Sequence, residues 1–283
     1  MDVQKIAAFA DGQKGGNPAG VVLTDMLPEA RIMQAMAAEV GFSETVFAAP
    51  QGEGWRVRYF SPENEVAFCG HATIALGAAL AQRFGANLFS LYLNEGEISV
   101  QGGVGGDPLA AQLRSLPTYN KPADPELLVK ALVLFGLQTN DIDLSIPPAQ
   151  VHAGADHLVL GLKDRAKLAA MSYDLAEGRA LMLAYGLVTI MLVSQKSPTS
   201  FDVRNAFASG GVVEDPATGA AAAAFAGYLR DKALLEIDWR VEQTIHLNQG
   251  DDMGHPSRLV ATVSPDKGTP AQVSGKVRLM QES

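Results

Sequence analysis

The chain has 283 residues, which at about 100–200 residues per domain predicts two domains. Apolar residues make up 47% and charged residues 19%, as in an ordinary globular protein. The net charge of −9 argues against a nucleic-acid partner and against docking on an anionic membrane. The single cysteine, Cys69, excludes an intrachain disulfide. With neither a signal-peptide pattern nor a spanning segment, the sequence predicts a cytoplasmic protein.

In the first half, residues 27–40 are predicted to form a helix, because apolar residues follow helical spacing after Pro28. Residues 45–49 and 55–60 are predicted strands, joined by a turn rich in Pro and Gly. Residues 73–84 then predict a helix of small apolar residues.

The second half predicts the same succession. Residues 166–185 are expected to be largely helical, residues 188–193 and 199–205 to be strands, and residues 218–232 to be an Ala-rich helix. Because Ala has high helix propensity and little bulk, such a helix can be enclosed closely by other elements.

An internal repeat accounts for this succession. Aligning Thr73 with Thr218 gives an offset of 145 residues (218 − 73), and the same offset aligns Glu44 with Thr189. Chance similarity in an Ala-rich chain is the other explanation, but the shared order of the matches favours a repeat.

The repeat predicts an α+β fold of two pseudo-symmetric domains, each a curved, mostly antiparallel sheet wrapped around a central helix. We expect an N-terminal domain over residues 1–118 and a C-terminal domain over residues 119–267, with a Pro-rich linker near 117–125. The final strand, about residues 268–283, is expected to cross back to the first domain.

Glu44 is the candidate acid/base residue, since the repeat places Thr189 at the equivalent position of the second half. A carboxylate in a semi-apolar pocket can accept and return a proton. The alternative is an ordinary Glu at a strand edge.

His71 and Asp215 lie near the starts of the two small-residue helices, whose free N–H groups suit a carboxylate or an enolate. The alternatives are a partly buried histidine and a helix cap.

Other chemistry finds little support in the sequence. Cys69 has no obvious partner base, so it is interpreted as core filler. His152 and His157 lie close together, but the chain has no Cys pair and no His-Glu-x-x-His motif. Walker, dinucleotide-binding and Gly-x-Ser-x-Gly motifs are also missing. We therefore expect no metal and no cofactor.

Several segments resemble those of a known family in the right order. They include Gly-Asn-Pro at residues 16–18, Gly-Phe-Ser-Glu-Thr at 41–45, the stretch ending in Cys-Gly-His-Ala-Thr at 69–73, the strand at 157–160, and Glu-Asp-Pro-Ala-Thr-Gly at 214–219. Together they resemble the PhzF-like (phenazine biosynthesis) isomerases, which have the diaminopimelate epimerase-like fold.

The resemblance implies an active site between two domains, a homodimer and no cofactor. Glu44 matches the Glu that moves a proton between carbons of a dihydro-hydroxyanthranilate in the phenazine enzyme. The substrate-binding residues implied by the same matches are Asn17, Gly70, His71, Asp215, Gly219 and Ala220. The related two-thiol epimerases need two Cys residues, so their mechanism is excluded here.

Two positions depart from the family pattern. Ala220 replaces a common Ser, and His255 replaces a usual Arg, so a bidentate grip on a carboxylate is weakened there unless Arg258 compensates. Both changes put the phenazine substrate in doubt.

The resulting hypothesis is a cofactor-independent isomerase that acts on a small carboxylated substrate in an interdomain cleft. Backbone donors at the helix N-termini hold the carboxylate, and Glu44 moves the proton. The alternatives are a one-base amino-acid racemase or epimerase, and a non-catalytic ligand-binding protein with the same cleft.

Overall fold

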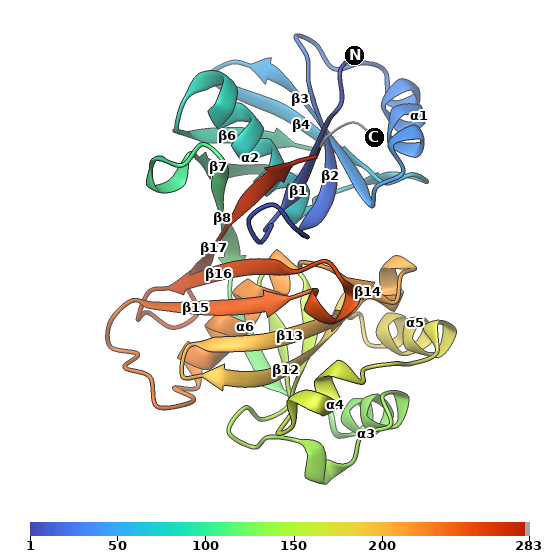
Figure 1. The fold of residues 1–283 in the computed structure, drawn as a ribbon, viewed down its shortest axis with the longest axis vertical. Coiled ribbons are helices and arrows are strands. Elements are labelled where there is room, and N and C mark those ends of the chain that lie inside the picture. Colours follow the sequence, from blue (N-terminus) through green and yellow to red (C-terminus); the bar gives the residue numbers. More distant parts are fainter. Residues whose placement is uncertain (95, 281–283) are drawn as a thin grey trace. The chain divides into compact units, whose positions relative to one another are not determined.

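The computed structural model describes residues 1–94 and 96–280 (Figure 1). It divides into two compact units: unit 1 consists of Met1–Arg114 and Ser274–Ser283, and unit 2 of Ser115–Val273. The boundaries expected from the sequence, at residues 118 and 267, lie a few residues from these. The chain enters unit 2 along one strand, β8 (Ala110–Pro117), and returns along another, β17 (Pro270–Leu279).

Unit 1 is built mainly of strands. Its elements before β8 are β1 (Gln4–Ala8), β2 (Asn17–Leu23), α1 (Ala30–Val40), β3 (Glu44–Gln51), β4 (Gly54–Phe60), β5 (Glu65–Val66), α2 (Gly70–Phe84), β6 (Asn87–Leu93), β7 (Gly96–Gly102) and the 3₁₀ turn Val104–Gly106. Strand β2 pairs with β1 antiparallel and with β3 parallel. Strand β4 pairs with β3 and β5 antiparallel and with β6 parallel, and β6 pairs with β7 antiparallel.

Helix α2 is the centre of unit 1. Every residue from His71 to Ala81 is buried, and the helix packs against β1, β2, β3, β6 and β7. Gly77 shows how closely the sheet approaches, because a Cβ added there would lie 2.6 Å from Cγ2 of Val100 on β7. Small residues are therefore what lets the sheet enclose this helix (Figure 1).

Unit 2 has more helices. Its elements after β8 are β9 (Tyr119–Pro122), α3 (Pro125–Leu134), the 3₁₀ turn Thr139–Asp141, β10 (Ala149–His152), β11 (Asp156–Gly161), α4 (Arg165–Ala169), α5 (Leu175–Ala184), β12 (Thr189–Ser197), β13 (Ser200–Ala206), the 3₁₀ turn Ala208–Gly210, β14 (Glu214–Asp215), α6 (Gly219–Asp231), β15 (Gln243–Gln249), the 3₁₀ turn Asp251–Met253 and β16 (Ser257–Val263). The expected linker near 117–125 is thus mostly strand β9 and the start of α3. The expected helix over 166–185 is two helices.

The strand pairing of unit 1 recurs in unit 2. Strand β11 pairs with β10 antiparallel and with β12 parallel, as β2 does with β1 and β3. Strand β13 pairs with β12 and β14 antiparallel and with β15 parallel, as β4 does with β3, β5 and β6. Helix α6, buried from Ala221 to Arg230, takes the place of α2. The predicted repeat is present in the topology.

The sequence alignment of the two central helices was wrong. Glu44 begins β3, which pairs in parallel with β2, and Thr189 begins β12, which pairs in parallel with β11. The match between these two residues is therefore correct. Gly70 and Gly219, however, begin the two helices, which makes Thr218, not Thr73, the residue before a helix. The shift arises because unit 2 carries an irregularity in the β12–β13 hairpin and the extra turn Ala208–Gly210 before β14.

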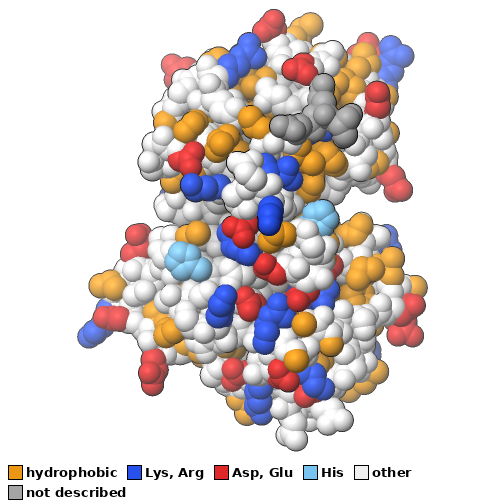
Figure 2. Space-filling model, in the orientation of Figure 1, with side chains coloured by type: hydrophobic (Ala, Val, Ile, Leu, Met, Phe, Trp, Pro, Cys, Tyr) orange, Lys and Arg blue, Asp and Glu red, His pale blue; other side chains and the backbone are white. Residues whose placement is uncertain are grey.

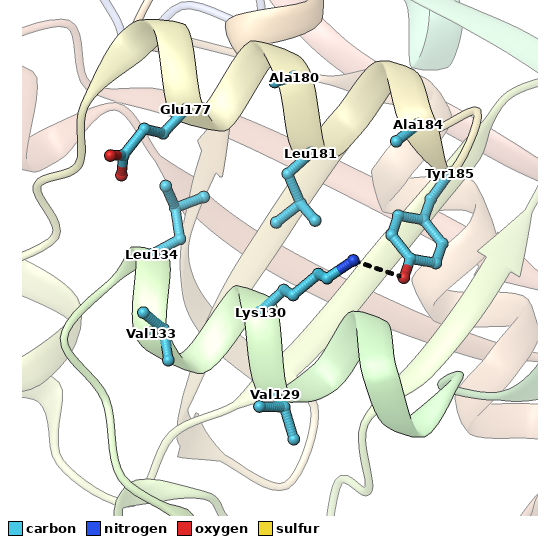
Figure 3. A pocket seen from close by; sticks show the side chains of 9 residues that line it. All are labelled: Val129, Lys130, Val133, Leu134, Glu177, Ala180, Leu181, Ala184 and Tyr185. Atoms are coloured by element: carbon cyan, nitrogen blue, oxygen red, sulfur yellow. Dashed lines mark hydrogen bonds between the residues drawn. The ribbon is translucent and has the colours of Figure 1, made fainter.

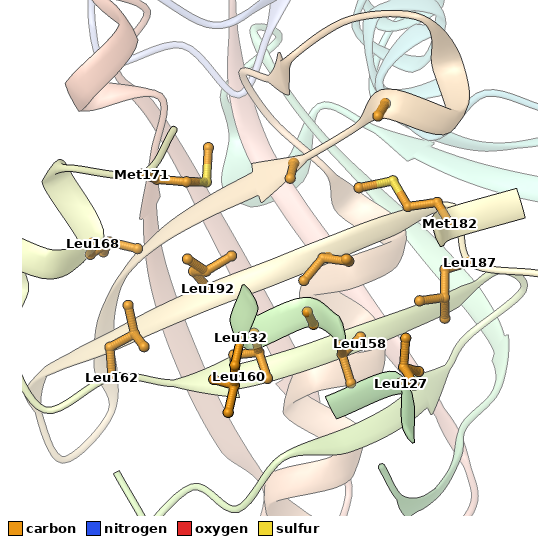
Figure 4. Close-up of a cluster of buried hydrophobic side chains, with 14 of the residues drawn as sticks. Leu127, Leu132, Leu158, Leu160, Leu162, Leu168, Met171, Met182, Leu187 and Leu192 are labelled. Carbon is orange, nitrogen blue, oxygen red and sulfur yellow. The ribbon is translucent and has the colours of Figure 1, made fainter. Parts of the chain in front are cut away.

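Unit 2 also contains a cluster of buried hydrophobic side chains on the side of α3, α4 and α5 (Figure 4). Leu127, Leu168 and Met182 come from these three helices, and they pack with Leu160 of β11 and Leu192 of β12. Among the described helices, we find none whose length and apolar character would let it span a lipid bilayer.

Charges of both signs are interspersed on the face shown in Figure 2. In unit 2, Arg165 forms ion pairs with Asp202 and Asp252, and Arg258 pairs with Asp251.

Candidate active site

Glu44 and His71 meet at one end of the central helix of unit 1. Glu44 begins β3, and His71 lies in the first turn of α2. Oε2 of Glu44 lies 3.4 Å from Nε2 of His71, and the hydroxyl of Ser43 lies at the same distance from that nitrogen. The side chains of Glu44 and His71 are 17% and 9% exposed, so both are largely shielded from water but still reachable.

Cys69 belongs to the same cluster. Its Sγ lies 3.3 Å from Nδ1 of His71, and the residue is buried. The sequence alone shows no partner for this thiol and predicts only a role in core packing. The contact arises because the helix begins directly after Cys69, which turns the imidazole back toward the residue two positions before it.

The N-terminus of α2 completes this part of the site. The residue before the helix, Cys69, makes no side-chain cap, and the first N–H groups of a helix have no intrahelical partner. Gly70 is the first helical residue and is only partly buried. Thr73, three residues after Gly70 in the helix, donates its hydroxyl to the Cys69 carbonyl oxygen at 2.7 Å. Asn17 begins β2 and is buried.

In unit 2, Asp215 lies before the equivalent helix. Its Oδ2 accepts a hydrogen bond of 2.6 Å from the hydroxyl of Thr218. Gln249 donates from Nε2 to the Asp215 carbonyl oxygen at 2.7 Å and accepts from the Thr218 N–H at 3.2 Å. Gly219 and Ala220, the first residues of α6, are partly buried. Two groups of expected site residues therefore gather within their own units.

Sequence reasoning missed the part played by Gln249. The residue at the end of β15 holds both Asp215 and the backbone that enters α6. In the sequence, Gln249 is marked only by its place six residues before His255, one of the two positions that depart from the family pattern. His255 is exposed, and the Arg258 guanidinium is paired with the Asp251 carboxylate at 2.8 Å.

The counterpart of Glu44 in unit 2 lies in a buried neutral network. The hydroxyl of Thr189 lies 2.7 Å from Nδ1 of His157 and donates to Oδ1 of Asn205 at 3.1 Å. Burial lowers the pKa of His157 to about 3, so this imidazole is neutral near pH 7. The two equivalent strand starts thus differ in chemistry, and of the two only Glu44 carries a carboxylate.

An open groove of about 490 Å³ lies elsewhere in unit 2, between α3 and α5 (Figure 3). Its lining is mainly aliphatic, and Lys130 at its edge donates to the Tyr185 hydroxyl at 3.5 Å. It contains none of the expected site residues.

Comparison with known proteins assigns the chain. The model of the phenazine biosynthesis-like protein (PhzC-PhzF) family matches residues 6–282. The chain belongs to this family. It is 31% identical to the trans-2,3-dihydro-3-hydroxyanthranilate isomerase of Pseudomonas aeruginosa, across 95% of this chain and 94% of that protein. It is 30% identical to an uncharacterized isomerase of Deinococcus radiodurans, across 92% and 85% of the two chains.

Solved structures confirm the fold of this PhzC-PhzF family member. The Bacillus anthracis phenazine biosynthesis protein of the PhzF family superposes with a TM-score of 0.86 at 24% identity, covering 99% of this chain and 98% of that one. A probable proline racemase of Agrobacterium radiobacter gives a TM-score of 0.62 at 12% identity, covering 99% and 92%. The predicted α+β fold and the prediction of an isomerase are both confirmed.

Proposed function

We propose that the protein is a cofactor-independent isomerase in which Glu44 alone removes and returns a proton on a small carboxylated substrate. The observation that carries this proposal is the position of Glu44. Its carboxylate lies against His71 at the N-terminus of a buried helix, and the Glu44 side chain is 17% exposed, so a proton taken from the substrate can exchange with solvent before it is returned.

The proton transfer needs no other reactant. The Glu44 carboxylate takes a proton from an acidic carbon, and the electron pair left behind is delocalised into the conjugated system as an enolate. The resulting Glu44 carboxylic acid then gives the proton to another carbon of that system, and a double bond shifts. The substrate leaves as an isomer and Glu44 is again a carboxylate.

Binding of the substrate is proposed to use the remaining expected residues. Backbone N–H groups at Gly70 and His71, and at Gly219 and Ala220, would hold acid groups, because helix N-termini attract anions. Asp215 would hold an amino or hydroxyl substituent, and Asn17 a further polar group. The ordered contacts of Asp215 with Thr218 and Gln249 support such a role, since they fix its orientation.

The named substrate of a relative is only one of the compounds that this protein should be tested with. Trans-2,3-dihydro-3-hydroxyanthranilate, named for the Pseudomonas aeruginosa relative, is the first compound to test. Ala220 and His255 depart from the family pattern, so the panel should also contain other unsaturated carboxylates and free amino acids.

The test follows deuterium from D₂O into each compound by NMR and mass spectrometry. We expect one deuterium at a new carbon together with a shifted double bond. Exchange at Cα with loss of optical purity would replace the proposal by a one-base racemase. Thermal stabilisation by a compound without any exchange would indicate a binding protein that lacks the chemistry.

A further inference from the structure

The cluster in unit 1 contains three different metal-binding groups. A carboxylate oxygen of Glu44, the thiol of Cys69 and a ring nitrogen of His71 all lie within 4.8 Å of one another. The residues come from the start of β3 and the start of α2, so two separate elements fix their positions. Among the described residues this is the one group of three such side chains close enough to share an ion.

The distances between the three groups are close to those around a small tetrahedral ion. Zinc bonds of about 2.0–2.3 Å at tetrahedral angles place neighbouring ligand atoms roughly 3.4–3.6 Å apart. Nε2 of His71 lies 3.4 Å from Oε2 of Glu44, whereas Sγ of Cys69 lies 3.3 Å from Nδ1 and 3.9 Å from Nε2. The thiol therefore lies beside the imidazole ring, and binding of one ion by all three groups requires the side chains of His71 and Cys69 to rotate.

The ligand types also select the ion. One thiolate, one imidazole and one carboxylate match the preferences of Zn²⁺, whereas Mg²⁺ and Ca²⁺ prefer oxygen alone. Three protein ligands leave the fourth position open, and the partial exposure of Glu44 provides access from solvent.

We propose that Glu44, Cys69 and His71 form a binding site for Zn²⁺ or a similar soft divalent cation. Binding releases the thiol proton of Cys69 to solvent, because the thiolate is the ligand. If Glu44 is the proton shuttle proposed above, the bound ion occupies its carboxylate and inhibits the isomerase. That second step rests on the proposed function, but the site itself does not.

The site is tested with Co²⁺ as a spectroscopic substitute for Zn²⁺, added to the full-length protein without a histidine tag. We expect one Co²⁺ per chain, a thiolate-to-cobalt charge-transfer band, and loss of this band when Zn²⁺ is added. Cys69→Ser should abolish the band and weaken Zn²⁺ binding by more than about tenfold, and Glu44→Gln should also weaken it. His246→Gln changes an exposed histidine outside the cluster and is the matched control.

The outcomes separate the two proposals. Absence of the band, or a band that survives in folded Cys69→Ser, overturns the metal site. Saturating Zn²⁺ should abolish deuterium exchange into a substrate. Bound Zn²⁺ with undiminished exchange would retain the metal site but contradict the role proposed for Glu44. Thermal unfolding of each variant shows whether a lost signal reflects a lost fold.

Discussion

At the scale of single residues, both units use the same ion pair. Arg58 of β4 binds Glu65 of β5, with Nε donating to Oε1 at 2.7 Å. Arg204 of β13 binds Glu214 of β14 in the same way and also donates to the Ala169 carbonyl oxygen at 2.8 Å. The pairs differ in burial: the Arg58 and Glu65 side chains are 21% and 27% exposed, against 10% and 4% for Arg204 and Glu214.

Replacing each arginine by methionine should therefore have unequal effects. Arg204→Met leaves a buried carboxylate without its partner, so we expect a loss of about 3–5 kcal/mol in the free energy of unfolding. Arg58→Met should cost about 1 kcal/mol, since water can reach Glu65. Urea denaturation of the two variants measures this difference, and equal losses would contradict the argument from burial.

His157 predicts how stability depends on pH. Burial lowers its pKa in the folded protein to about 3, whereas the unfolded chain has the ordinary value of about 6.5. Between about pH 6.5 and pH 3 the unfolded state therefore binds a proton that the folded state does not. Within this window the free energy of unfolding decreases by up to about 1.4 kcal/mol for each unit by which the pH is lowered.

The variant His157→Gln lacks this group, so its unfolding free energy should vary less between pH 7 and pH 5 than that of the wild type. Denaturation at several pH values in that range gives both slopes. Parallel slopes would show that His157 is not held neutral by burial.

At the scale of elements, the small residues of α2 determine how closely the sheet approaches. Gly77→Ala would raise intrinsic helix propensity by about 1 kcal/mol. The added methyl group would, however, lie 2.6 Å from Val100 and 3.2 Å from the Ala111 side chain. We expect the overpacking to dominate, with a net loss of about 1–2 kcal/mol in thermal or chemical denaturation. A variant as stable as the wild type or more stable would contradict this.

Much at this scale could be predicted from the sequence. Runs of small apolar residues indicated both central helices, and their Ala content indicated that they are enclosed. The relative register of the halves could not be predicted, because the turn Ala208–Gly210 shifts the start of α6 without leaving a clear sequence signal. The match between Thr73 and Thr218 therefore aligned residues that are not equivalent.

Part of the candidate site could be proposed from the sequence. Glu44, His71 and Asp215 stood out by their place beside the repeated helices or in family motifs. Cys69 and Gln249 did not, because their contacts depend on how a helix starts and on a strand far along the chain. Composition and spacing carry no information about such contacts.

At the scale of the whole molecule, the family resemblance predicts a homodimer. Sedimentation equilibrium should then give twice the chain mass of 29.8 kDa at micromolar concentration. A mass of one chain across that range would contradict the prediction, while leaving the assignment to the PhzC-PhzF family unchanged.

The duplication places a carboxylate at only one of the two equivalent strand starts, Glu44 and Thr189. Thr189 contacts His157, which is neutral near pH 7. The carboxylate of unit 2 among the candidate site residues, Asp215, instead accepts a hydrogen bond from Thr218. A single acid/base group on a repeated scaffold can both remove and return a proton, and this is the central claim of the proposed function.

The most direct test replaces Glu44 by glutamine and measures turnover on whichever compound the wild-type protein isomerises. We expect Glu44→Gln to reduce the rate by at least about 100-fold while its thermal unfolding stays unchanged. The control Glu39→Gln, an exposed residue on α1, should retain the full rate. A folded Glu44→Gln protein that turns over its substrate as fast as the wild type would contradict the account.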